Sequence, residues 1–308
     1  MSGFGMFSWF SYQLPIQQRL QMIRSAGFDA VSLWWGDELQ DKNSQPEMAR
    51  KLGLDIDYVH APCNNPNDLW IDGLNGDDYL RIIASCISDC EHYNIPTVVM
   101  HITRLSSKPK VTQIGLERMK RLVDFSEKKK INLALENLDS IQHLDYIYEN
   151  IKSEYLGFCY DSGHEYFNHR DADCLSRYGN KLFAVHLDDN CGDDDTHLLP
   201  YDGDINWDII KQKLKKCNNL RYLTLEVDFN RNHKKSSLYK DLSANEFVAL
   251  AYKRILLLKY INSSLSRKPE NREPDFFFVY GQKENPSPGK REGHCHYSVT
   301  AGISPTKL

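Results

Sequence analysis

The chain has 308 residues, of which 41% are hydrophobic and 26% are charged, and its formal net charge is -4. This composition is typical of a globular protein and excludes a collagen-like or largely disordered chain. The acidic balance argues against binding nucleic acid mainly through phosphates, and no apolar run approaches the ~20 residues of a membrane span. No secretory signal is visible at the start of the sequence, so we expect a cytoplasmic protein that does not contact a membrane.

Short apolar segments rich in β-branched and aromatic residues alternate with amphipathic segments along the chain. Eight of the apolar segments are predicted strands: 4–9, 30–35, 55–60, 97–102, 131–136, 156–161, 182–187 and 222–227. Helical spacing of apolar residues predicts helices at 15–26, 77–93, 113–130, 208–216 and 243–261. The alternation predicts an α/β fold, a (β/α)8 TIM barrel. The alternative is an open doubly wound sheet, but its usual glycine-rich loop is absent from the first predicted turn, 9–13.

The eight cysteines are scattered along the chain, and none belongs to a CxxC pair. Without secretory context, this pattern predicts reduced thiols that act mostly as small apolar side chains. The sequence therefore gives no sign of a zinc finger.

The composition changes after Asn262. Residues 263–308 contain five prolines, show no helical periodicity, and include one isolated apolar run at 275–280. We therefore expect a barrel domain at 1–262 and an irregular C-terminal tail at 263–308 that is disordered or loosely docked. Docking of the phenylalanine-rich run on the barrel or on a partner is the sharper alternative.

Most of the predicted strands end in a residue that can bind a metal ion or transfer a proton. These residues are His60, His101, Glu136, Asp161, His186 and Glu226. Catalytic groups of a (β/α)8 barrel lie at the carboxyl ends of its strands, so we expect these side chains to converge. Each alone could be a hydrogen-bonded core residue or a helix cap. Together, several carboxylates at one barrel mouth would repel one another unless a cation or protons neutralised them.

Glu136, Asp161, His186 and Glu226 are the best candidates for a single metal site. Three carboxylates and one imidazole form a hard, oxygen-rich set that suits Mn²⁺, Mg²⁺ or Co²⁺ at least as well as Zn²⁺. The polar segment 188–207 follows the seventh predicted strand and contains Asp195 and His197, which could point to the same side of an extended loop. The alternative is a polar turn that leads into the next helix.

Several longer motifs are more specific than single residues. They are FSWF at 7–10, GFDAVSLWWG at 27–36, HAPCNNPNDLW at 60–70, ENL at 136–138, DSGH at 161–164, HLDDN at 186–190 and HLLP at 197–200. With these motifs the chain resembles the xylose isomerase-like TIM-barrel superfamily, in its sugar phosphate isomerase/epimerase branch, over residues 4–262. The family's P-G-E-G-x-I-D-W stretch reads PYDGDINW at 200–207, where Tyr201 replaces the first glycine.

The resemblance implies both a metal site and a reaction. In ketose epimerases of this superfamily, one divalent ion is held by residues that correspond to Glu136, Asp161, His186 and Glu226. The two glutamates are implied as the acid/base pair, and His164 is implied to hydrogen-bond a substrate oxygen. The implied reaction isomerises or epimerises a small sugar or sugar phosphate by carbon-bound proton transfer through an enediolate, with the metal acting as Lewis acid. A homo-oligomer is compatible with the sequence.

The related endonuclease IV family is the competing interpretation. Its nine ligands for three zinc ions correspond here to His60, His101, Glu136, Asp161, His164, His186, Asp195, His197 and Glu226, all of the matching residue type. Against a nuclease, Cys63 stands where that family has a DNA-inserting tyrosine, and the chain is acidic. A barrel that binds a metabolite without catalysis is a third alternative, but simple binding does not need two opposed glutamates.

Further residues near the predicted mouth are candidates for substrate contacts. Arg104, just past His101, could reach a phosphate or carboxylate of the substrate, or pair with a neighbouring acid. Trp9, Trp34, Trp35 and Trp70 could form an apolar wall against a sugar ring, with packing in the barrel as the alternative.

Overall fold

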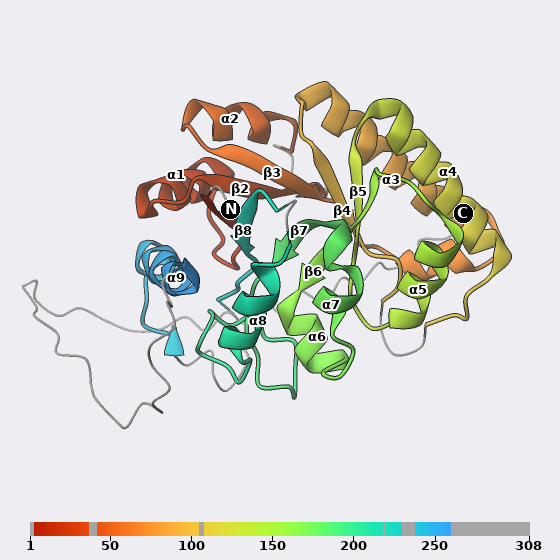
Figure 1. Ribbon diagram of the computed structural model, residues 1–308. Coiled ribbons are helices and arrows are strands. Elements are labelled where there is room, and N and C mark those ends of the chain that lie inside the picture. The colour runs from red at the N-terminus through yellow and green to blue at the C-terminus, as the bar shows by residue number, and fades with distance from the viewer. Residues whose placement is uncertain (1–2, 37–41, 105–107, 218–219, 230–237, 260–308) are drawn as a thin grey trace, which may run out of the picture. The chain divides into compact units, whose positions relative to one another are not determined.

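The computed structural model describes residues 3–36, 42–104, 108–217, 220–229 and 238–259. Strands and helices alternate along these residues, and the strands form a barrel with the helices outside it (Figure 1). The strands are β1 (Gly3–Phe7), β2 (Ala30–Trp34), β3 (Asp55–His60), β4 (Thr97–Met100), β5 (Asn132–Glu136), β6 (Leu156–Asp161), β7 (Leu182–His186) and β8 (Tyr222–Leu225). All eight predicted strands are therefore present.

The sheet is parallel throughout, with the strand order β7-β6-β5-β4-β3-β2-β1-β8. A parallel bridge between Leu187 and Leu225 joins the two ends of this order. There the Leu187 N–H donates to the Thr224 carbonyl at 3.0 Å, and the Glu226 N–H donates to the Leu187 carbonyl at 3.3 Å. These bonds close the sheet, so the predicted TIM barrel is confirmed, and the carboxyl ends of all eight strands meet at one mouth.

Four helices match the predicted periodicity within a few residues at each end, and the described part of a fifth also does. They are α1 (Ile16–Ala26), α3 (Leu74–Tyr93), α4 (Gln113–Lys129), α8 (Trp207–Leu214) and α9 (Ala244–Lys259). Four shorter helices were not predicted: α2 (Gln45–Lys51), α5 (Ile141–Asn150), α6 (Ser162–Asn168) and α7 (Cys174–Tyr178). Each spans so few turns that its apolar period is not distinguishable from a loop pattern.

The side chains of the strands are divided between an outer and an inner face. Residues such as Val98, Met100, Leu133 and Leu135 belong to the large core between strands and helices. The alternate residues form a separate, smaller cluster made of Tyr58, Val99, Ala134, Cys159 and Ala184. Since successive side chains of a strand point to opposite faces, this second cluster fills the barrel interior. These side chains fill the barrel directly beneath its mouth.

Two expectations concern parts of the chain outside this description. The tail predicted at 263–308 and the domain boundary before it lie outside the described residues. Within the described ranges, no helix combines the length and hydrophobicity that crossing a membrane requires.

Candidate active site

The predicted strand-end residues share one face of the sheet for a simple reason of register. Glu136 lies two residues after Ala134, Asp161 two after Cys159, and His186 two after Ala184. Because the period of a strand is two, each follows an interior residue and points into the same barrel mouth. The same offset relates His60 to Tyr58 and His101 to Val99.

Glu136 lies at the centre of this mouth and is 1% exposed. Its Oε2 is 3.2 Å from His60 Nε2 and 3.1 Å from His101 Nε2. Its Oε1 is 2.9 Å from His164 Nδ1 and 3.4 Å from His186 Nδ1. One buried carboxylate therefore contacts four imidazoles, which is far more than a helix cap or a single ion pair requires.

The four residues proposed for a single metal site lie together. His186 Nδ1 is 2.7 Å from Glu226 Oε2 and 3.6 Å from Asp161 Oδ2. One ligand atom from each of Glu136, Asp161, His186 and Glu226 lies within 4.8 Å of the others. Asp161 also caps α6, because its Oδ1 accepts the His164 backbone N–H at 2.7 Å. This bond fixes the carboxylate so that Oδ2 faces the cluster.

The remaining candidate ligands form an adjoining group. His164, Asp195 and His197 offer ligand atoms within 4.8 Å of one another. Asp195 Oδ2 lies 3.1 Å from His164 Nε2 and 3.4 Å from His197 Nε2. His197 adopts a left-handed backbone with φ of 45°, and its Nδ1 lies 2.9 Å from the Glu226 carbonyl oxygen. The loop after β7 is therefore bent back toward β8, and all nine predicted ligand positions gather at one mouth.

Charges inside the cluster shift its titration strongly. Burial raises the pKa of Glu136, but His186 and His101 outweigh it and hold that pKa well below its usual range. Burial lowers the pKa of His101, but Glu136 and Cys63 raise it to about 9. Glu226 behaves like Glu136, with His186 bringing its pKa down to about 2 against the effect of burial. Glu136 and Glu226 are thus held in the charged form that binds a cation, whereas burial and the neighbouring Asp161 raise the pKa of Asp188 well above its usual range.

The cluster fits a divalent metal ion. Four of the buried carboxylate oxygens without a hydrogen bond to the described residues belong to this cluster: Glu136 Oε1, which has only its ion-pair contacts with His164 and His186, Asp161 Oδ2, Asp188 Oδ2 and Asp195 Oδ1. Buried polar atoms normally have partners, and a cation is the partner that a converging set of carboxylates and imidazoles provides for. The set is rich in oxygen and nitrogen, which suits Mn²⁺, Mg²⁺, Co²⁺ or Zn²⁺.

Asp188 is a further residue of the site that the sequence marked only as part of a polar string. It is fully buried, its Oδ1 accepts the Gly163 N–H at 3.1 Å, and its Oδ2 is 3.7 Å from His197 Nδ1. A Cβ atom on Gly163 would lie 2.3 Å from Asp188 Oδ2. Gly163 therefore allows α6 to approach Asp188 and to bring His164 into the cluster.

A cavity of about 660 Å³ opens above these ligands. Glu136, Glu226, His164 and Asp195 are among the residues that line it. Arg104 and Lys108, from the chain after β4, line it too, together with Cys63 and with Phe167 and His169 around the end of α6. The volume is within the range of small-molecule sites. Lys108, Phe167 and His169 were not among the predicted residues, because they lie away from the strand ends.

The tryptophans separate by one residue of register. Trp34 lines the cavity, and its ring centroid lies 5.4 Å from that of His60. Trp35 points to the opposite face, where it is buried and its Nε1 donates to Asp89 Oδ2 at 2.8 Å. Trp70 Nε1 donates to the Ile102 carbonyl at 2.7 Å. The Arg19 Cζ atom lies over the Trp9 ring, 5.0 Å from the centroid of that ring. Neither Trp9 nor Trp35 lines the cavity, so Trp34 supplies the apolar wall.

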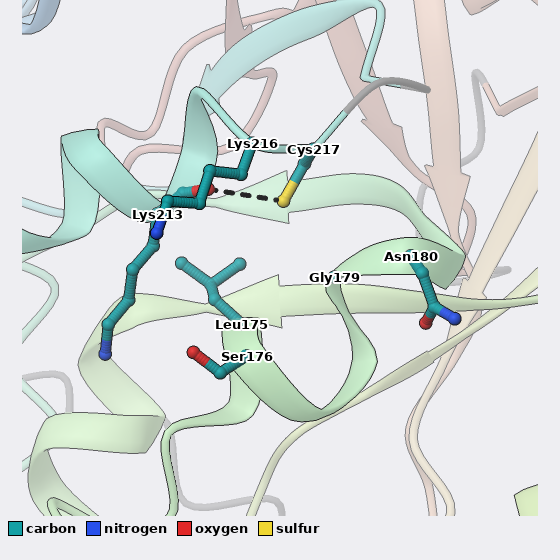
Figure 2. Close-up of a pocket in the computed structure, with 7 residues that line it drawn as sticks. All are labelled: Leu175, Ser176, Gly179, Asn180, Lys213, Lys216 and Cys217. Atoms are coloured by element: carbon teal, nitrogen blue, oxygen red, sulfur yellow. Dashed lines mark hydrogen bonds between the residues drawn. The ribbon is translucent and has the colours of Figure 1, made fainter.

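A second cavity, of about 430 Å³, lies where the chain leads into β7 and β8 (Figure 2). Its walls come from α7, from the 3-10 turn Gly179–Lys181 and from the end of α8. Asp173 Oδ1 lies 2.8 Å from Lys213 Nζ and accepts the Ser176 N–H, and Cys217 Sγ donates to the Lys213 carbonyl at 3.6 Å. Among the described residues, none of the metal-ligand groups is here. This cavity belongs to the amino ends of the strands.

Comparisons with known proteins agree with the barrel fold. The family model described as xylose isomerase-like TIM barrel matches residues 20–243. An uncharacterized protein, y4fM, of Sinorhizobium fredii is 26% identical over 261 residues, which cover 71% of this chain and 83% of that protein.

Solved structures share the fold. A D-tagatose 3-epimerase-like protein superposes with a TM-score of 0.63 at 20% identity, covering 83% of this chain and 99% of its own. The zinc-bound IolI protein does so with a TM-score of 0.66 at 17% identity, covering 84% and 99%. With the family model matching most of the barrel, the chain belongs to the xylose isomerase-like TIM-barrel family.

Proposed function

We propose that the protein is a divalent-metal-dependent isomerase or epimerase that acts on a sugar or sugar phosphate by carbon-bound proton transfer. One observation carries the proposal. Glu136 and Glu226 approach the same Asp161–His186 pair from β5 and from the end of β8, and both line the cavity. A binding site needs ligands, whereas two carboxylates that reach the substrate space from different strands also provide an acid and a base.

Glu136, Asp161, His186 and Glu226 would hold the ion. A bound divalent ion there would act as a Lewis acid on a carbonyl and an adjacent hydroxyl of an open-chain sugar, which acidifies the neighbouring carbon-bound proton. The donor set suits Mn²⁺, Mg²⁺ or Co²⁺, and Zn²⁺ is the ion in the IolI protein of the same fold.

The chain's own residues would then remove the carbon-bound proton, which leaves an enediolate, and return a proton to that enediolate. Glu226, whose side chain is 15% exposed to the cavity, and the nearly enclosed Glu136 are the base and the acid. Return of the proton to the other face of the same carbon epimerises the sugar, and return to the neighbouring carbon isomerises it. Trp34 covers an apolar part of the sugar, and His164 hydrogen-bonds a substrate oxygen.

Exchange of solvent deuterium tests this function. Metal-loaded protein is incubated in deuterated water with a panel of ketoses, aldoses and their phosphates, and deuterium at carbon is read by NMR. We expect the wild type to incorporate deuterium. The variant Glu226→Gln should lose this incorporation, and the surface variant Glu91→Gln should keep it. No incorporation from any sugar of a broad panel would contradict the proposal.

An apurinic-site nuclease like endonuclease IV is the second candidate, favoured by the gathering of all nine potential ligands. The groups His60–His101–Glu136 and His164–Asp195–His197 could hold ions besides the first. Against it, Cys63 lines the cavity at the position of the inserting tyrosine, and the net charge is -4. Metal analysis and a nicking assay on abasic DNA separate the two: three zinc ions per chain with efficient nicking would replace the isomerase proposal.

A further inference from the structure

The cavity above the metal ligands carries two cationic side chains that proton transfer at carbon does not use. Arg104 and Lys108 both line it, and they come from the chain that follows β4. The other ionisable groups of the lining are carboxylates, imidazoles and the Cys63 thiol, most of them in the ligand cluster. Two cations in the same cavity as a metal site favour a ligand that is negatively charged at the end that does not contact the metal.

Arg104 is held in place by its backbone, and its guanidinium is left to the cavity. Its N–H donates to Asn67 Oδ1 at 2.9 Å, and Asn67 Nδ2 donates to its carbonyl at 2.7 Å. The guanidinium makes two long bonds, from Nη1 to the Cys63 carbonyl at 3.4 Å and to Cys63 Sγ at 4.0 Å. Within the described ranges it has no ion pair with a carboxylate, so its forked donors remain for a ligand.

Lys108 is only loosely compensated. Its Nζ is 4.0 Å from Asp139 Oδ2, beyond hydrogen-bond distance, and the Thr103 hydroxyl donates to Asp139 Oδ1 at 2.6 Å. That bond anchors Asp139, so the carboxylate cannot swing to enclose the ammonium without losing it. Lys108 therefore has one long ion pair, to a carboxylate that the Thr103 hydroxyl also binds.

We propose that Arg104 and Lys108 form an anion subsite, and that the substrate is a sugar with a phosphate or carboxylate substituent. The inference rests on the proposed function: the carbonyl end of the sugar lies at Glu136 and Glu226, and the anionic end lies at Arg104. A guanidinium binds phosphate and carboxylate through paired hydrogen bonds, and an ammonium adds a point charge. A neutral sugar would leave both cations partly desolvated and without a partner.

Calorimetric binding to the Mn²⁺-loaded protein tests the subsite without relying on turnover. The probes are a ketopentose and a ketohexose, their terminal phosphate esters, a ketose with a terminal carboxylate, and inorganic phosphate. The anionic sugars are expected to bind about 10- to 100-fold more tightly than the neutral ones, because charge-assisted bonds are added. The stronger of the phosphate and carboxylate arms identifies the natural substituent.

Arg104→Gln and Lys108→Gln should each remove most of this gain and change the affinity for neutral sugars less than about twofold. Arg81→Gln, on the outer surface of α3, is the matched control and should change neither. Equal binding of neutral and anionic sugars, equal weakening of both by Arg104→Gln, or no binding by any anionic probe would overturn the subsite.

The two proposals fail in different ways. Arg104-dependent binding of anionic sugars without deuterium exchange would leave the subsite and remove the isomerase function. Exchange into neutral and anionic sugars alike that is unaffected by Arg104→Gln would keep the isomerase function and remove the subsite.

Discussion

Polar side chains line both cavities, one at each end of the barrel, but the partners of these side chains differ. At the amino ends of β7 and β8, Lys213 is paired with Asp173. Figure 2 shows the bond of the Cys217 thiol to the backbone carbonyl of Lys213. At the carboxyl ends, Glu136 is surrounded by imidazoles, and the buried Oδ2 atoms of Asp161 and Asp188 make no hydrogen bond with the described residues. Leaving a buried polar group unsatisfied costs stability, so several such carboxylate oxygens at one place favour a bound cation there. The candidate active site therefore differs from the amino-end cavity in its converging buried carboxylates and imidazoles.

The largest effect should come from removing the charge at the centre of the carboxyl-end cluster. In Glu136→Gln the amide cannot take up a proton and is a poorer metal ligand, although its size is kept. We expect solvent-deuterium exchange into the substrate to fall on the order of 10³-fold. Rates of the variant, the wild type and Glu91→Gln, whose carboxylate pairs with Lys129 on the surface, provide the comparison. A rate within tenfold of the wild type would contradict the role of Glu136.

Below the cluster, Asp57 should make stability depend on pH. It is 2% exposed and accepts a hydrogen bond from the Thr224 hydroxyl at 2.9 Å, and burial raises its pKa to about 7. The folded state therefore keeps a proton that the unfolded chain releases near pH 4. Protonated Asp57 therefore adds to the free energy of unfolding at low pH, and this stabilisation is lost as the pH rises from about 4 to 7. At about 1.4 kcal/mol per pKa unit, a shift of about three units corresponds to a loss of about 4 kcal/mol.

Denaturant unfolding at several pH values measures this contribution. Asp57→Asn, which is neutral at every pH, should be more stable than the wild type at pH 8 and should flatten the profile between pH 4 and 7. If wild type and Asp57→Asn showed the same dependence of unfolding free energy on pH, the raised pKa of Asp57 would be contradicted.

Adding one methyl group at each end should separate the two cavities. In Gly163→Ala the new Cβ would lie 2.3 Å from Asp188 Oδ2, so α6 or Asp188 must move and His164 moves with it. We expect a loss of about 1–3 kcal/mol in unfolding free energy, together with weaker metal binding. In Gly179→Ala the nearest atom is Cys217 Sγ at 3.0 Å, at the edge of the amino-end cavity. Its metal affinity should be unchanged. Equal metal affinity in both variants would contradict the role of Gly163.

The smallest effect should follow Cys217→Ser. The side chain is partly buried and its thiol makes one weak bond to a helix carbonyl, which a hydroxyl can also make. Deuterium exchange and metal content should match the wild type, and the unfolding free energy should change by less than about 1 kcal/mol. A marked loss of exchange would mean that the amino-end cavity takes part in function.

The barrel and its ligand cluster were accessible from the sequence because both depend on the period of a strand. Once 131–136 and 156–161 are parallel strands of a barrel, Glu136 and Asp161 lie at their carboxyl ends, which meet at the mouth. The choice between Trp34 and Trp35 was not accessible, because one residue of register decides which ring enters the cavity. The pairing of Arg104 with Asn67, and the approach of Lys108 to Asp139, join loops whose relative positions no local pattern encodes.

Metal content per chain tests the central claim most directly. Wild-type protein, Glu136→Gln, Glu226→Gln and Glu91→Gln are equilibrated with Mn²⁺, Co²⁺ or Zn²⁺ in separate samples, freed of excess ion and assayed by elemental analysis. The account predicts one tightly held ion in the wild type and in Glu91→Gln, with much less in Glu136→Gln and Glu226→Gln. Wild-type protein that retains no Mn²⁺, Co²⁺ or Zn²⁺, or variants that retain as much as the wild type, would contradict it.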